Sequence, residues 1–144
     1  MDLMATPASA QYAPATDQEP AQQLPFYSQY HTSGSAGVDV FSHNVSRMPG
    51  EPRPCFGFCF PPPKMVGVVL QHLAECKARA VVIVPDQRQV WFPLLSGAIV
   101  RSVAASKIGD EGVFFRLHHQ KGHVPVVFQS CAMRAVEIDF RNNT

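Results

Sequence analysis

The feature that most constrains this sequence is an apolar segment stopped by consecutive prolines. Residues 55–60 read CFGFCF, and Pro61, Pro62 and Pro63 follow directly. Aromatic residues favour extended strands, whereas proline cannot donate a hydrogen bond to a strand ladder. The segment therefore predicts a buried strand that ends in a rigid loop.

An amphipathic helix and a second strand are expected after this loop. Between residues 64 and 79, apolar residues recur in pairs with a period near 3.6, and the polar residues stay off that stripe. Residues 80–84 (AVVIV) form a continuous apolar run closed by Pro85 and Asp86, which is typical of a strand covered on both faces in a parallel sheet. Strand, helix and strand together predict a right-handed βαβ unit.

The C-terminal part of the sequence predicts antiparallel structure. A shorter helix is expected to begin near Pro93 and to extend to Ile99. Two strands are expected at residues 113–118 and 124–128, on either side of a polar turn, and residues 135–140 (AVEIDF) alternate as a last strand would.

These elements define the predicted fold class. We expect an α/β domain of three layers, whose parallel centre gives way to antiparallel C-terminal strands. In sheets of this kind ligands bind beyond the carboxyl ends of the strands, which places a candidate site at the loops of residues 61–64 and 85–89.

The first third of the chain has a different composition. Ten of the 13 prolines fall in residues 1–63. Residues 5–23 have no apolar period, and residues 24–41 regain aromatics around a turn-like run, so this stretch is expected to lie across a folded surface without forming an element. We therefore divide the chain into a Pro/Ser-rich, partly irregular segment (1–53) and an α/β core (54–144).

Composition excludes several classes of protein. The chain has 144 residues, enough for one domain, and its net charge of +1 gives no overall field that would attract nucleic acid or an anionic membrane. Residues 64–144 are the more basic part, with ten basic and six acidic residues, and so the likelier face for a polyanion. No apolar run is long enough to span a bilayer and no export signal is visible. We expect an intracellular protein, nuclear or cytoplasmic and not secreted, with reduced cysteines.

A zinc site is the first candidate for a metal centre. Cys55 and Cys59, together with His119 and His123, have spacings that zinc sites allow. On an extended strand, however, two residues four apart are separated by about 13 Å, whereas two sulfurs on one zinc lie within ~5 Å of each other. The spacing favours buried structural thiols, with zinc as the weaker alternative.

Nucleotide chemistry has little support in the sequence. Neither a GxGxxG nor a GxxxxGK[ST] phosphate loop is present. Trp91 and Phe92, beside Arg88, are arranged so that they could stack on a base, although an aromatic pair at the start of a helix is more often part of the packing.

Six blocks of sequence, spread over nearly the whole chain, point to one family. They read DLMATPASAQ (2–11), LPFYSQY (24–30), GVDVFSHNV (37–45), FCFPPPKMVGVVLQHLAE (58–75), AVVIVPD (80–86) and VWFPLL (90–95). In this order the chain resembles the phage-type DNA adenine-N6 methyltransferase (Dam) domain, in the divergent form carried by polyproteins of DIRS-type tyrosine-recombinase retroelements. The resemblance implies a truncated Rossmann-like methyltransferase fold.

The resemblance also implies a site. In that family an Asp closes the first strand and contributes to the S-adenosylmethionine pocket, and Asp2 occupies the matching position. The first strand would begin upstream of Asp2, so this segment is expected to hold only a fragment of it, with an incomplete cofactor pocket.

An Asn-Pro-Pro-Tyr loop binds the target amine in the active enzymes, and the matching residues are Phe60, Pro61, Pro62 and Pro63. Phe60 has no acceptor for the amine and Pro63 has no π face to stack on a flipped base, so the resemblance implies a degenerate catalytic loop.

Two functions are compatible with this pattern. The first is a retroelement-derived DNA adenine-N6 methyltransferase-like domain without activity, with S-adenosylmethionine as a cofactor by resemblance only. The second is a non-catalytic module of a retrotransposon polyprotein that binds nucleic acid or protein beside the reverse transcriptase and ribonuclease H. DNA and neighbouring polyprotein domains are the expected partners, and no membrane is.

Overall fold

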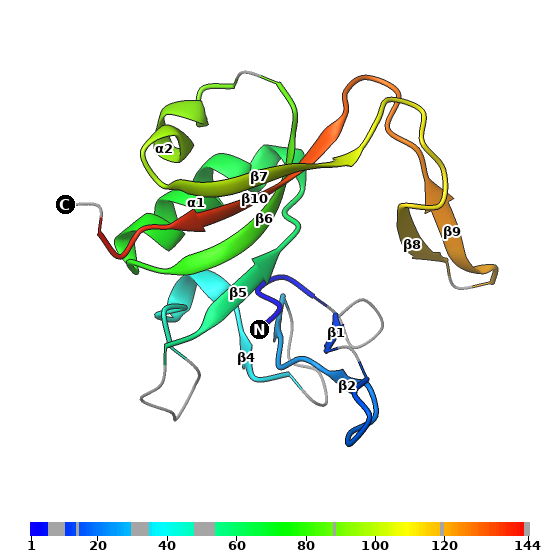
Figure 1. Ribbon diagram of the computed structural model, residues 1–144, viewed down its shortest axis with the longest axis horizontal. Coiled ribbons are helices and arrows are strands. Elements are labelled where there is room, and N and C mark those ends of the chain that lie inside the picture. Colours follow the sequence, from blue (N-terminus) through cyan, green and yellow to red (C-terminus); the bar gives the residue numbers. More distant parts are fainter. Residues whose placement is uncertain are drawn as a thin grey trace.

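The computed structural model describes residues 1–5, 11–13, 15–29, 35–47, 54–87, 89–118 and 120–142. Its centre is a mixed sheet of four strands in the order β5–β6–β10–β7 (Figure 1). These strands are β5 (Phe56–Cys59), β6 (Arg79–Pro85), β10 (Met133–Asp139) and β7 (Ile99–Ser106). The chain therefore has the mixed α/β architecture that its sequence predicts.

The strand–helix–strand unit is confirmed. β5 and β6 pair in parallel, and between them the chain forms the short 3-10 helix η2 (Pro63–Met65) and the helix α1 (Val66–Glu75). The α-helix is shorter than predicted because the prolines hold its start in a 3-10 turn and Lys77, at φ 52°, ends it in the left-handed region. The apolar stripe is buried as expected, at Val66, Val69, Leu70 and Leu73.

The C-terminal strands are antiparallel, as predicted. β10 lies between β6 and β7 and is antiparallel to both. The helix α2 (Phe92–Ser96) is shorter than expected, because Gly97 follows it and Ile99, predicted to be helical, begins β7. The β-branched residues Ile99, Val100 and Val103 favour a strand, and the tertiary contact with β10 decides between the two structures.

Residues 1–5 extend the sheet beyond β5. The Leu3 amide donates to the Phe58 carbonyl at 2.8 Å, and Asp2 forms a parallel bridge with Phe58. Gly57 allows this close approach, because a Cβ at that position would lie 2.9 Å from Leu3 Cδ1.

Two further short strands continue the sheet on the other side of residues 1–5. The Tyr27 amide donates to the Asp2 carbonyl at 2.9 Å, and β3 (Tyr27–Ser28) pairs in parallel with β4 (Gly37–Val38). The parallel segments are thus ordered β4, β3, residues 1–5, β5 and β6. The expectation that residues 24–41 form no element was wrong, since main-chain pairing with residues 1–5 orders them.

The helices share one face of the sheet. α1 and α2 contact each other, with Trp91 against Gly67, and both bury apolar residues in the core. The first third of the chain belongs to this core as well. The members of the core include Met1, Leu3, Tyr27, Val40, Val45, Leu70, Leu73, Val82, Leu95 and Ile138.

The other face of the sheet has no helix packed on it in the described ranges. Strand register places Phe56 and Val103 on this face, and each is about half exposed. The three-layer prediction was therefore wrong. A doubly wound sheet needs helices in the links between its first strands, and the described link between residues 11 and 24 forms only the two-residue strands β1 (Tyr12–Ala13) and β2 (Gln22–Gln23).

A hairpin arm extends from the sheet. The arm consists of β8 (Phe114–His118) and β9 (Gly122–Val126), which pair with each other and project to one side in Figure 1. This confirms the predicted hairpin, with its second strand starting two residues earlier. Among the described helices, none is both long and apolar enough to cross a membrane.

Candidate functional site

A cavity of about 700 Å³ lies where four neighbouring parallel segments end. Ala5 closes the N-terminal segment, Ser28 closes β3, Asp39 follows β4, and Phe60 follows β5. Apolar side chains make most of the wall, including Leu3, Met4, Val40, Phe41, Pro62 and Met65. The sequence predicted a site at the carboxyl ends of the strands, and the loop after β5 does line this cavity.

Asp39 supplies the carboxylate of the cavity. It adopts a φ of 56° and caps the 3-10 helix η1 (Val40–Ser42), accepting the Phe41 amide at 3.2 Å on Oδ1 and the Ser42 hydroxyl at 2.9 Å on Oδ2. Asparagine and aspartate tolerate this backbone conformation better than other residues with a Cβ. The cap fixes the carboxylate in place, and each oxygen keeps a lone pair for a ligand.

A hydroxyl group accompanies this carboxylate. Ser28 lies at the end of β3, where its hydroxyl donates to that of Ser35 at 2.9 Å. Apolar walls with a few fixed polar groups are the usual construction of a small-molecule pocket. The cavity therefore suits a small ligand that has apolar surface and a few hydrogen-bond donors.

Asp2, the residue predicted to contact the cofactor, has a structural role here. Its side chain is buried, and its oxygens accept the amides of Met4 and Gln11, each at 3.2 Å. Burial raises the pKa of Asp2, and the two amide donors oppose the rise. The Asp2 carboxylate therefore holds the main chain of residues 1–5 and Gln11 in place. It does not line the cavity, whereas the next two residues, Leu3 and Met4, do.

The three prolines at residues 61–63 lie in different environments. Pro61 is fully buried, Pro62 lines the cavity, and Pro63 is exposed as the first residue of η2. The Pro62 carbonyl accepts the Met65 amide at 2.8 Å, which anchors the loop to the start of the helix. Pro85 and Asp86, expected on the adjoining loop, do not line the cavity; the Asp86 carboxylate lies 3.8 Å from Arg134.

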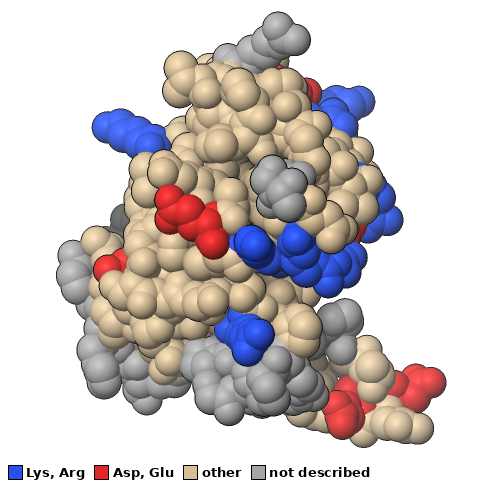
Figure 2. Space-filling model, turned by 90° about the vertical axis from the view of Figure 1, so that its left-hand side faces the viewer, with Lys and Arg blue, Asp and Glu red and all other residues tan. Residues whose placement is uncertain are grey.

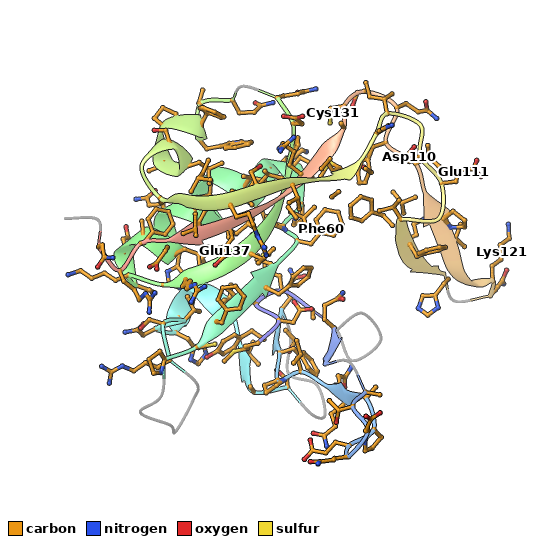
Figure 3. All side chains as sticks on the ribbon, in the orientation of Figure 1. Phe60, Asp110, Glu111, Lys121, Cys131 and Glu137 are labelled. Atoms are coloured by element: carbon orange, nitrogen blue, oxygen red, sulfur yellow. The ribbon has the colours of Figure 1, made fainter. Side chains whose placement is uncertain are left out.

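Phe60 connects the site to the hairpin arm. Its ring centroid lies 5.0 Å from that of Phe114 and 6.4 Å from that of Phe128, and those two rings are 5.3 Å apart. Figure 3 shows Phe60 at the end of β5, on the side of the sheet from which the arm extends. An aromatic cluster therefore forms where Phe60 follows β5, and this side chain offers no hydrogen-bond acceptor to a ligand.

The remaining candidates do not form a site. Cys59 is fully buried, and burial together with the nearby Asp2 raises the pKa of its thiol, which keeps it protonated and unreactive. No group of three or more His, Cys, Asp or Glu in the described part of the chain could hold a metal ion. His119, from the zinc hypothesis, and Arg88, from the stacking hypothesis, lie outside the described residues. Trp91 is buried against α1, which supports its packing role.

Sequence reasoning missed Asp39, Ser28 and Phe41 as components of the site. The signal was the run Asp39-Val40-Phe41-Ser42, because an Asp that precedes a short apolar turn is a typical N-cap. The cavity itself required the tertiary pairing of β3 and β4 with residues 1–5.

Comparison with known proteins gives no relative. No family model matches the chain, and no curated protein or solved structure is significantly similar to it.

Proposed function

We propose that this chain is a catalytically inactive domain of the DNA adenine-N6 methyltransferase type, derived from a DIRS-type retroelement. It binds the adenosyl part of S-adenosylmethionine in the cavity at the carboxyl ends of the parallel segments. The observation that carries the proposal is the place of that cavity in the order of the strands.

The strand order supports a Rossmann-like methyltransferase fold. From residues 1–5 the chain adds β3 and then β4 on one side, and afterwards β5 and then β6 on the other. This is the third-second-first-fourth-fifth order of a doubly wound sheet, in which the ligand binds where the direction of winding reverses. That switch point lies between residues 1–5 and β5, and Leu3 and Phe60 bring the cavity to it.

The last two strands agree with the same interpretation. β10 lies between β6 and β7 and is antiparallel to both, and the sequence pattern predicted antiparallel strands in this part of the chain. In the part of the chain that the structure describes, the helices cover one face of the sheet only, whereas a doubly wound fold carries helices on both faces.

The residues present fit the adenosyl part of the cofactor. The volume of about 700 Å³ is within the ordinary range of ligand pockets, and Phe41 and Met65 provide apolar surface for a purine. The Asp39 carboxylate can accept from the ribose hydroxyls or the adenine amino group. Among the described residues, the lining has no basic side chain for the carboxylate of the methionine tail, so we assign only the adenosyl part to this cavity. When bound, the cofactor would supply the methyl group.

Methyl transfer is not expected, because the amine acceptor is missing. Phe60 presents a ring without lone pairs and is packed against Phe114 and Phe128. Preorganised polar groups commonly contribute several kcal/mol to transition-state stabilisation, and each ~1.4 kcal/mol changes the rate tenfold. Pro63 also lacks the aromatic ring on which a flipped adenine would stack.

Calorimetry with S-adenosylhomocysteine tests the cofactor pocket. We expect the full chain to bind this unreactive product, and Asp39→Asn to lose roughly tenfold in affinity, because a hydrogen bond to a charged group is worth about 1.5–3 kcal/mol. Asparagine keeps an acceptor for the Phe41 amide and tolerates the backbone of Asp39. The matched control is Asp110→Asn, whose carboxylate accepts the Lys107 amide away from the cavity, and its affinity should equal that of the wild type.

Two results would contradict the proposal. A folded wild-type chain that gives no binding heat with S-adenosylhomocysteine would remove the cofactor pocket. Transfer of radiolabelled methyl groups from S-adenosylmethionine to adenine N6 of unmethylated DNA, by the same protein, would show that the domain is active.

A further inference from the structure

A second pocket lies at the opposite end of the sheet, where β5 and β6 begin. It has a volume of about 540 Å³. Its lining, as far as the structure describes the chain, includes four basic side chains, Arg47, Lys77, Arg79 and Arg141, but no carboxylate. We call it the basic pocket. No described residue lines both the basic pocket and the cavity assigned to the cofactor, so this inference does not rest on the proposed function.

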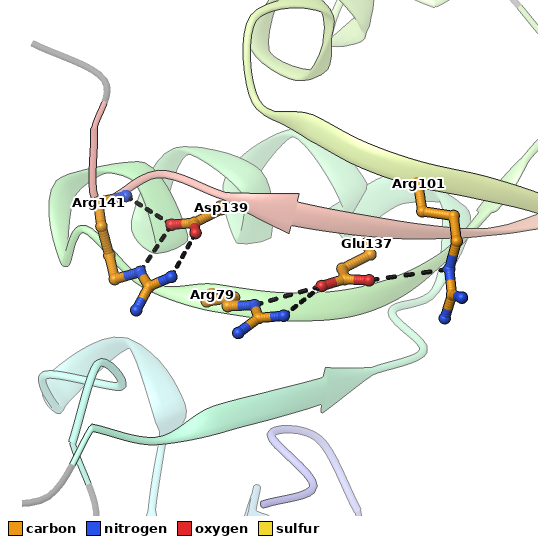
Figure 4. A network of polar contacts seen from close by, with 5 residues as sticks. All are labelled: Arg79, Arg101, Glu137, Asp139 and Arg141. Carbon is orange, nitrogen blue, oxygen red and sulfur yellow. Dashed lines mark hydrogen bonds and ion pairs between the residues drawn. The ribbon is translucent and has the colours of Figure 1, made fainter.

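Two of the guanidinium groups are held by carboxylates outside the lining. Arg79 lies 2.6 Å from Glu137, and Arg141 lies 2.6 Å from Asp139, which has its pKa lowered to about 2 chiefly by that hydrogen bond. Arg101 lies 3.9 Å from the other oxygen of Glu137. Figure 4 shows this row of alternating charges along the start of β6 and the end of β10.

The other two cations give the pocket its positive charge. Neither Arg47 nor Lys77 has an ion-pair partner within the ranges that the structure describes. The Lys77 backbone is fixed at the end of α1, where its amide donates to the Ala74 carbonyl at 3.0 Å. Figure 2 shows basic side chains gathered on this face of the molecule.

An exposed aromatic ring completes the basic pocket. Phe56, the first residue of β5, is 47% exposed and lies on the sheet face that carries no described helix. The Arg79 guanidinium packs over its ring at 4.8 Å from the centroid. A ring and a guanidinium stacked in this way present flat surfaces on which nucleobases stack, and such stacking is independent of sequence.

We propose that the basic pocket binds single-stranded nucleic acid, with a base on Phe56 and backbone phosphates on Arg47 and Lys77. The combination of aromatic ring and unpaired cations identifies this ligand. A duplex keeps its bases stacked inside and would contact the cations alone, and an acidic peptide has no base for the ring.

Fluorescence anisotropy with a labelled oligothymidylate of about twelve nucleotides tests the proposal, a length within the usual site size. Arg47→Gln/Lys77→Gln should weaken binding at least tenfold and reduce the slope of log K against log salt by about 1.4, because each phosphate contact on a single strand contributes about 0.7. Phe56→Leu keeps the apolar bulk and should weaken binding roughly tenfold without changing the salt slope.

Controls separate this site from general charge. Lys107→Gln/Arg116→Gln removes the same charge from the β7–β8 link and the arm, and its affinity should stay within about twofold of the wild type. Circular dichroism melting of each variant checks that it is folded.

Three outcomes would overturn the proposal. In the first, the folded wild-type chain does not bind oligothymidylate at low salt. In the second, the control pair loses as much affinity as Arg47→Gln/Lys77→Gln. In the third, Phe56→Leu binds as the wild type does while a duplex or polyglutamate competes equally well, which would identify a general anion site. The S-adenosylhomocysteine measurement is unaffected by any of these results.

Discussion

At the scale of single residues, the two aspartates near the cavity have different roles. Asp2 is buried and its oxygens are used by the amides of Met4 and Gln11. Asp39 lines the cavity while it caps η1. Both side chains accept hydrogen bonds in turns that follow parallel segments. Of the two, only Asp39 lines a cavity that a ligand can enter.

The pH dependence of stability tests the role of Asp2. Burial raises its pKa above the ordinary 3.8, so the folded protein holds this proton more tightly than the unfolded chain does. Its contribution to the free energy of unfolding therefore falls as pH rises from 3.8 through the raised pKa, and stays at the lower value near neutrality. Asp2→Asn should remove this fall, so that in urea titrations the variant gains stability relative to the wild type as pH rises.

Asp2→Ala provides the comparison for that experiment. It removes both acceptors of these part-buried hydrogen bonds, at a cost of about 0.5–1.5 kcal/mol for each bond lost. If Asp2→Asn and the wild type show parallel pH profiles, the carboxylate is not buried in the way described here.

At the scale of elements, α1 holds the parallel pair together. Its apolar stripe packs on β6, and Leu70 is fully buried in the common core. Val68 is in the same helix but outside the stripe, and its side chain is exposed. Substituting each of these two residues by alanine therefore compares the loss of a buried side chain with the loss of an exposed one on the same helix.

Leu70→Ala should lower the free energy of unfolding by about 2–5 kcal/mol, the range for a large buried side chain cut back to alanine. Val68→Ala, at a position that is 55% exposed, should change it by less than about 0.5 kcal/mol. Chemical denaturation of both variants measures the difference. Equal effects would show that α1 does not pack through the stripe.

At the scale of the whole molecule, the structure consists of a sheet with helices on one face and an arm that extends from it (Figure 1). Phe60, Phe114 and Phe128 form the aromatic contact between the arm and the loop after β5. The ring of Phe60 thus connects the sheet to the arm in this protein.

Phe60→Ala should release the arm without unfolding the sheet. Aromatic pairs of this kind contribute about 0.5–1.5 kcal/mol, so amide exchange in β8 and β9 should become up to roughly tenfold faster while exchange in β6 and β10 is unchanged. Phe115→Ala, at an exposed position of the same arm, is the matched control and should leave exchange in the arm unchanged. Uniformly faster exchange across the sheet in Phe60→Ala would mean that the ring supports the core.

The sequence by itself determined the elements whose signal is local. The prolines after Cys59, the 3.6-residue period of α1, the β-branched run of β6 and the polar turn of the arm each predicted an element that the structure contains. These signals predict elements correctly because they involve residues only a few positions apart. Proline restricts the backbone next to it, and one buried face sets the spacing of apolar residues along a helix or strand.

Tertiary pairing alone decided the rest. Residues 1–5, β3 and β4 carry no periodic signal, and they become strands because their main-chain groups pair with one another and with β5. Ile99 joins β7 because β10 lies beside it. Both pockets are made by residues distant in sequence, such as Asp39 with Phe60 and Arg47 with Arg141. No local pattern specifies such neighbours, because their proximity depends on which strand edges remain free to pair once the local elements have formed.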